Sequence, residues 1–104
     1  AIMAETEPTS LYFSRARPAF KWSRKAADQG EASAQLTLGV MYVNGNGVKK
    51  DYVRAHMWSN LSTANGNKGS RKIRDALEKH MTPSQISEAQ KLARECVQRN
   101  YKNC

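Results

Sequence analysis

The chain has 104 residues, of which 39% are apolar and 25% are charged, with three Pro and six Gly. This composition excludes a collagen, a proline-rich linker and a wholly disordered chain, and the length suits one domain with one modest core. The formal net charge is +8, and residues 53–104 contribute most of it, with ten Lys and Arg against four Asp and Glu. Such a surface attracts polyanions or acidic proteins, but it identifies no particular partner.

The beginning of the chain carries no recognisable targeting signal. Residues 1–10 lack the apolar stretch of a secretory signal, although a mature chain would look the same after cleavage. No apolar run approaches the roughly 20 residues of a membrane helix, so we predict no membrane span. The compartment stays open between cytoplasm and periplasm. We expect residues 1–17 to be irregular, as a leader or a truncated repeat.

The first predicted hairpin occupies residues 18–50. Pro18 suits a first helical turn, and Gly30 can supply the left-handed residue that ends this helix. A second helix follows, with apolar residues at helical spacing, and it ends at the loop sequence Asn-Gly-Asn-Gly of residues 44–47. This loop superficially resembles a phosphate cradle, but it lacks the preceding strand and the full phosphate-loop spacing. We therefore interpret it as a turn whose glycines take positive φ.

The second predicted hairpin occupies residues 51–81 and copies the first with an offset of 36 residues. Residues 19–23 (AFKWS) align with residues 55–59 (AHMWS), so Trp22 and Trp58 share one local frame. We expect both tryptophans to pack in the core between hairpins that lie side by side. Asp51 is a suitable N-cap for this unit. Residues 82–104 then form a C-terminal capping helix and tail, and Thr82, Pro83 and Gln85 predict a capping box at its start. No segment has the pattern of a strand, so the predicted fold is all-α.

The repeated residues resemble the Sel-one-like repeat (SLR) family, relatives of the tetratricopeptide repeats. The family pattern A-x-x-W-x-x-x-A-A…G-x-x-x-A-Q-x-x-L-G-x-x-Y…G-x-G-V…D maps without gaps onto Ala19, Trp22, Ala26, Ala27, Gly30, Ala34, Gln35, Leu38, Gly39, Tyr42, Gly45, Gly47, Val48 and Asp51. Residues 10–17 depart from this pattern because they lack the G-x-G-V loop expected before a repeat. The resemblance implies a short right-handed α-solenoid of αα-hairpin repeats, closed by the capping helix.

By the same resemblance, the chain is expected to be a non-enzymatic bacterial adaptor without a cofactor, whose concave surface binds a protein or peptide. The first helix of each hairpin faces that surface in the family, so its residues off the Trp and Ala stripe are candidate contacts for an acidic partner. They are Lys21, Arg24, Lys25, Arg54, Met57, Asn60 and Leu61. Met57 and Leu61 would supply apolar anchorage. The alternative is that Leu61 packs internally and that the charges only confer solubility.

A second basic cluster supports an alternative function. It consists of Lys68, Arg71, Lys72, Arg74 and Lys79. A basic nucleic-acid-binding protein could use these side chains, but recognition of this kind usually adds exposed aromatic residues or a helix that fits a groove. A solvated face is the preferred interpretation, and an acidic protein partner remains an option.

Catalytic and metal-binding patterns are weak. His56 and His80 have no metal-ligand spacing, and Cys96 lies on an apolar helical face where a thiol is unreactive. We therefore expect no metal site and no catalytic role for the pair Cys96 and His80. Cys96 and Cys104 would be about 12 Å apart on a continuous helix, so a bridge would require the chain to fold back. Free thiols are the preferred interpretation.

Two repeats are few for a continuous core. We therefore predict that the open N-terminal end is covered, either by residues 1–17 or by a second copy of the chain in a homodimer.

Overall fold

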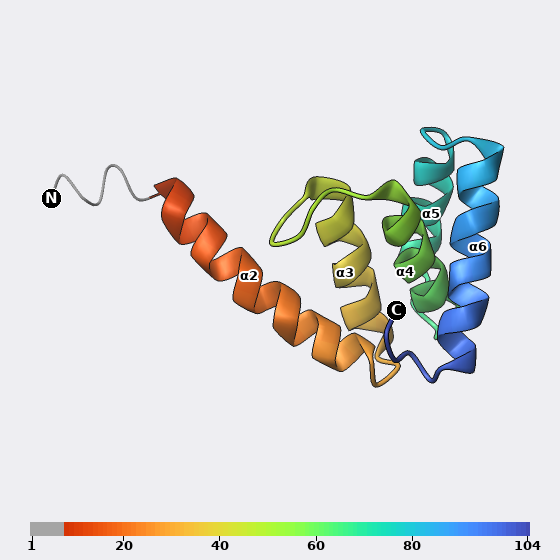
Figure 1. The fold of residues 1–104 in the computed structure, drawn as a ribbon, viewed down its shortest axis with the longest axis horizontal. Helices are drawn as coiled ribbons and strands as arrows, with labels where there is room; N and C mark the ends of the chain where they lie inside the picture. Colours follow the sequence, from red (N-terminus) through yellow and green to blue (C-terminus); the bar gives the residue numbers. More distant parts are fainter. Residues whose placement is uncertain (1–7) are drawn as a thin grey trace, which may run out of the picture.

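The protein is a row of helices, as a computed structural model shows for the backbone of residues 8–104 and the side chains of residues 17–104 (Figure 1). The helices are α2 (Pro8–Ala27), α3 (Ala32–Asn44), α4 (Tyr52–Ala64), α5 (Gly69–Glu78) and α6 (Pro83–Gln98), and residues 8–104 contain no strand. Helix α4 is central, because α3, α5 and α6 all pack against it, while α2 packs on α3 at one end. The all-α prediction is therefore confirmed. In the same described range, no helix has both the length and the apolar content needed to cross a membrane.

The start of the first helix differs from the prediction. Helix α2 begins at Pro8 and places Pro18 in its interior, so the expected helix start at Pro18 is wrong, as is an irregular conformation for residues 8–17. The expectation for residues 1–7 lies outside the described residues. Proline fits the first turn of a helix at either position. An interior proline removes one backbone hydrogen bond and crowds the preceding turn, which is why Pro18 was predicted to start the helix. Local sequence therefore could not choose between the two prolines.

The turns between helices form as the glycines predict. Gly30 (φ 83°) follows α2, and Gly45 (φ 71°) ends α3 while its N–H donates to the carbonyl oxygen of Met41. Gly47 also takes a positive φ of 74° in the loop that leads to α4. Asp51 then caps α4, since its carboxylate accepts a hydrogen bond from the N–H of Arg54 at 3.1 Å. These contacts confirm the turn interpretation of residues 44–47.

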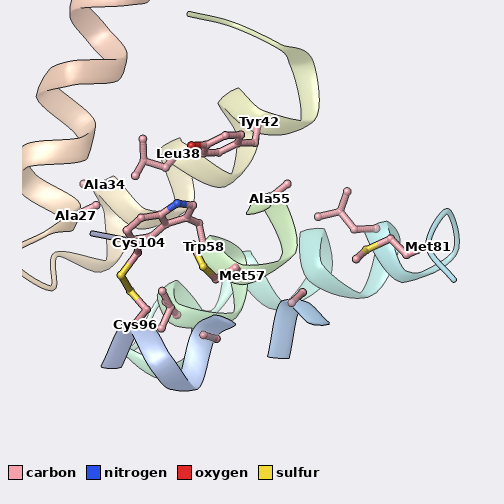
Figure 2. Packing of buried hydrophobic residues seen from close by; sticks show 14 residues of the cluster. Ala27, Ala34, Leu38, Tyr42, Ala55, Met57, Trp58, Met81, Cys96 and Cys104 are labelled. Atoms are coloured by element: carbon pink, nitrogen blue, oxygen red, sulfur yellow. A yellow bond between two sulfur atoms is a disulfide. The ribbon is translucent and has the colours of Figure 1, made fainter. Parts of the chain in front are cut away.

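The core is built around α4. Trp58 is fully buried and lies between Leu38 of α3 and the sulfur atoms of Cys96 and Cys104 (Figure 2). Small residues allow the helices to approach closely: a Cβ added to Gly39 would lie 3.2 Å from the carbonyl oxygen of Ala55. Close packing of α3 on α4 is the lateral stacking of hairpins that the repeat predicts.

Trp22 does not occupy the place predicted for it. Its side chain is 71% exposed, whereas Trp58 is 0% exposed. The difference is physical: the preceding hairpin covers Trp58, and the Arg24 guanidinium of α2 lies 5.3 Å from the centre of its ring. Trp22 lies on α2, the first helix of the described residues, and none of these residues covers its side chain as the hairpin covers Trp58. The core role predicted for Trp22 is therefore wrong.

The final helix starts as predicted and ends differently. Thr82 and Gln85 form the complete capping box, with the Gln85 N–H donating to the Thr82 hydroxyl and the Thr82 N–H donating to the Gln85 side chain. After α6 the chain reverses through residues with positive φ at positions 100, 101 and 103. This reversal brings the Cα atoms of Cys96 and Cys104 to 5.4 Å and joins the two residues in a disulfide. The preference for free thiols is therefore wrong, because it assumed a helix that continues to the end.

Candidate partner-binding surface

Most of the candidates on the first helices are engaged within the chain. The Arg24 Nε donates to Asp28 Oδ1 at 2.9 Å, in addition to the contact of Arg24 with Trp58. Arg54 Nη1 donates to the carbonyl oxygen of Cys104 at 2.7 Å, and its Nε lies 3.7 Å from Asp51 Oδ2. Arg24 therefore contacts α4 through Trp58, and Arg54 joins α4 to the C-terminal tail.

Both arginines also influence a buried phenol. Burial raises the pKa of Tyr42 above its ordinary value of 10.0, and the positive charges of Arg54 and Arg24 oppose part of this rise. Tyr42 therefore stays neutral at physiological pH and acts as a packing residue, with its ring edge-on to Phe20 of α2 at a centroid distance of 5.7 Å.

Two of the remaining candidates on α4 are buried, and the third is hydrogen-bonded within the chain. Met57 is 1% exposed and Leu61 is 2% exposed, so the apolar anchorage predicted for them is wrong. Asn60 Oδ1 accepts a hydrogen bond from Arg74 Nη1 at 2.9 Å. Because α3, α5 and α6 all pack against α4, most sides of this helix are buried. The helical spacing of apolar residues within one segment could not predict this.

The C-terminal tail occupies the ends of the hairpins. Lys102 Nζ donates to the carbonyl oxygen of Asp28 at 3.4 Å, and the Tyr101 hydroxyl donates to Asn65 Oδ1 at 3.2 Å. The Tyr101 ring also packs on Gly30, where an added Cβ would lie 3.2 Å from a ring carbon. Together with the bond from Arg54 to Cys104, these contacts join the tail to α2 and α4. Of the candidate contacts, the tail therefore engages Arg54.

Lys21 and Lys25 have a different setting, because both are exposed on the outward side of α2. Together with neighbouring side chains they line an open hollow of about 410 Å³. We call the surface around this hollow the α2 outer face; its residues are Arg17, Pro18, Lys21, Trp22 and Lys25. At 100° per residue, these five positions span a sector of roughly 140°. Lys25 Nζ lies 5.9 Å from the centre of the Trp22 ring, a distance that permits a cation–π contact.

Of the residues on this face, only Lys21 and Lys25 were predicted from the sequence as partner contacts. Arg17, Pro18 and Trp22 were missed because Trp22 was assigned to the core and Pro18 to a helix start. The available signal was the departure from the repeat pattern in residues 10–17, which lack the G-x-G-V loop that would precede a repeat.

The basic cluster of the C-terminal half lies on and beside α5, at the opposite end of the helix row from α2 (Figure 1). Four of its five side chains are exposed, namely Lys68, Arg71, Lys72 and Lys79. Arg74 is partly engaged, with its Nε donating to Asp75 and its Nη1 donating to Asn60. The exposed Trp22 is remote from this cluster. Binding of nucleic acid by these residues stays a prediction.

Among the described residues, no three His, Cys, Asp or Glu side chains converge as metal ligands. His56 is buried on α4, with its Nε2 2.9 Å from Glu78 Oε1, while His80 is exposed and lies beside the ring of Tyr52. The Cys96 sulfur is bonded to Cys104 and so offers no thiolate.

The fold is that of a helical repeat solenoid. Residues 15–31 and 32–67 match the Sel1 repeat, and together they make up about half of the chain. The chain therefore belongs to the Sel1 repeat family, whose proteins are protein-interaction scaffolds. The matched unit 32–67 joins α3 to α4, whereas the sequence division joined α4 to α5. In a periodic array this is a choice of starting point, and the division at residues 18–50 and 51–81 stays a prediction.

A solved structure supports the same assignment. The chain is similar to c5321, a protective antigen present in uropathogenic Escherichia coli strains and displaying an SLR fold, with 33% identity and a TM-score of 0.77. The similarity covers 83% of this chain and 20% of that protein, so the chain spans about one fifth of its length. No curated protein matches the chain significantly.

Proposed function

We propose that this chain is a non-enzymatic binding module that recognises an acidic segment of a partner protein. The observation that carries the proposal is Trp22, a large aromatic side chain that is 71% exposed beside exposed Lys and Arg residues. Trp, Tyr and Arg are enriched among the side chains that contribute most of the binding energy of protein interfaces. The Sel1 repeat fold supports the same class of function. Arg54 and Asn60 on α4 form hydrogen bonds within the chain, so the exposed residues of α2 are the better candidates for the binding site.

The disulfide supports a location for this module. Disulfides persist in oxidising compartments and are rare in the cytosol of most organisms. The bond between Cys96 and Cys104, which also holds the tail on the hairpins, therefore favours a periplasmic or extracellular setting over a cytoplasmic one. Labelling of the protein in its source cells with a bulky maleimide, before and after reduction, tests this point. Immediate labelling of both cysteines would contradict it.

Site-specific photo-crosslinking in the source cells tests the binding function. A photoreactive amino acid replaces Lys21 on α2 in one variant and Lys72 on α5 in a matched variant, since both side chains are exposed. We expect a discrete protein adduct from position 21 that is absent from position 72, and that rebinds the purified chain. Adducts with nucleic acid from position 72 alone would instead support the alternative function. Absence of any protein adduct from either position would contradict the binding function.

A further inference from the structure

The two tryptophans provide an internal comparison, because they occupy equivalent positions in the repeat but have different surroundings. Trp58 shows what this position accepts: it is covered by a helical hairpin, with the Arg24 guanidinium over its ring. Trp22 presents the same side chain on a helix of the same kind, and none of the described residues covers it in this way. The shape that completes the position is therefore a helix laid along α2.

The charge of the α2 outer face restricts the occupant. Arg17, Lys21 and Lys25 take part in none of the ion pairs formed by the described residues, and Pro8–Ala27 contains no Asp or Glu. A second copy that presented its own α2 would bring the same three cations into contact, at a net charge of +8 per chain. Like charges that face one another across an interface oppose association, so this face is poorly suited to pairing with itself.

The spacing of the face specifies what a partner must present. Arg17, Lys21 and Lys25 follow one another every four residues, about 6 Å apart along the helix axis. Pro18 and Trp22 form a parallel apolar row beside them and line the same hollow of about 410 Å³. A partner helix with an apolar row flanked by Asp or Glu every three or four residues would match both rows at once.

From these observations we infer that the α2 outer face docks an acidic amphipathic helix of a partner protein, with an apolar side chain of that helix against Trp22 and its carboxylates on Lys21, Lys25 and Arg17. This inference rests on the proposed binding function and specifies its site and its partner chemistry.

Titration with a designed peptide tests the inference on the full chain. The probe is a helical peptide of about 18 residues with Leu on one face, Glu on both flanks and no Trp, long enough to be helical in isolation. Its control has the same composition in an order that scatters the Leu residues around the helix. Binding should shift the emission of Trp22 to the blue and leave the buried Trp58 unaffected. The scattered peptide should bind at least about tenfold more weakly, because it keeps the charge and loses the apolar row.

Four variants locate the site. W22A and K21E should each weaken peptide binding by roughly tenfold or more. V97A and K72E are matched controls, because Val97 is 51% exposed on α6 and Lys72 is exposed on α5, and both should bind as the wild type does. Thermal melting by circular dichroism confirms that each variant is folded. Since Trp22 and Lys21 are both exposed, neither substitution should disturb the core.

Several results would overturn the inference. Equal binding of the two peptides would mean general attraction of anions, and no binding would remove the acidic helix as occupant. Self-association that W22A abolishes would make a second copy the occupant. The binding function itself is judged separately by the crosslinked partner. If that partner binds W22A as tightly as the wild type, the docking site is wrong while the scaffold function stands.

Discussion

Truncation of each tryptophan to Ala tests the packing directly, because Trp22 and Trp58 have similar local sequences but one is exposed and the other is buried. Trp58 is fully buried beneath the Arg24 guanidinium and against Leu38, so W58A removes the largest side chain of the core. Substitutions of this kind cost about 3–5 kcal/mol, through lost burial and the cavity that remains. Trp22 is 71% exposed, and changes at such surface positions usually stay within about 0.5 kcal/mol. The expected difference between the two variants is therefore several kcal/mol.

Urea unfolding, followed by far-ultraviolet circular dichroism, measures both free energies. For a domain of about 100 residues, each kcal/mol lowers the melting temperature by about 4–8 °C, so W58A should melt at least about 12 °C below the wild type. Total stabilities are commonly only about 5–15 kcal/mol, so W58A could be partly unfolded, and W58F then provides a milder truncation that keeps the transition measurable. Similar losses for W22A and W58A would refute the packing described for α2 and α4.

Three further predictions concern single contacts. The double variant C96A/C104A should lose about 2.5 kcal/mol of unfolding free energy, which is the chain-entropy value for so short a loop. Dithiothreitol should have no additional effect on the urea midpoint of this variant. A urea midpoint equal to that of the wild type would mean that the disulfide does not stabilise the tail. G39A should destabilise the fold by about 1–2 kcal/mol despite the better helix propensity of Ala, because the new Cβ would lie 2.7 Å from Ser59 Oγ and 3.2 Å from a backbone carbonyl oxygen. In a double-mutant cycle, S59A should relieve part of this loss. A stabilising effect of G39A would contradict the close approach of α3 and α4. T82A should cost about 1 kcal/mol through loss of the capping box, measured by thermal melting, with the neighbouring exposed S84A as its control.

The charge pattern of the chain also has a functional consequence. The basic cluster on and beside α5 (Lys68, Arg71, Lys72, Arg74 and Lys79) and the α2 outer face lie at opposite ends of the helix row, so one ligand of modest size would not contact both (Figure 1). A salt titration with nucleic acid therefore separates the two hypotheses: K72E should reduce any nucleic-acid binding and its salt dependence, whereas W22A should leave that binding unchanged.

Periodicity and local chemistry in the sequence were enough to predict the helical class, the family and most helix ends. Gly30, Asp51 and Thr82 act through backbone atoms within a few residues of themselves, so their roles can be predicted without knowledge of the fold. The buried stripe that includes Leu38 was predicted for a similar reason, since helical spacing places its members on one face.

Only the tertiary structure decided which of two equivalent residues is buried and which side chains remain free for a partner. Burial depends on what packs against a residue from elsewhere in the chain: α2 and α3 cover Trp58 (Figure 2), whereas none of the described helices covers Trp22, although their local sequences match. Met57 is likewise buried because α4 has neighbours on several sides, and Arg54 is engaged because the tail, held by a disulfide, returns to it. These contacts join residues far apart in sequence, and no local pattern specifies them. The α2 outer face is one of the surfaces that remain exposed once they have formed.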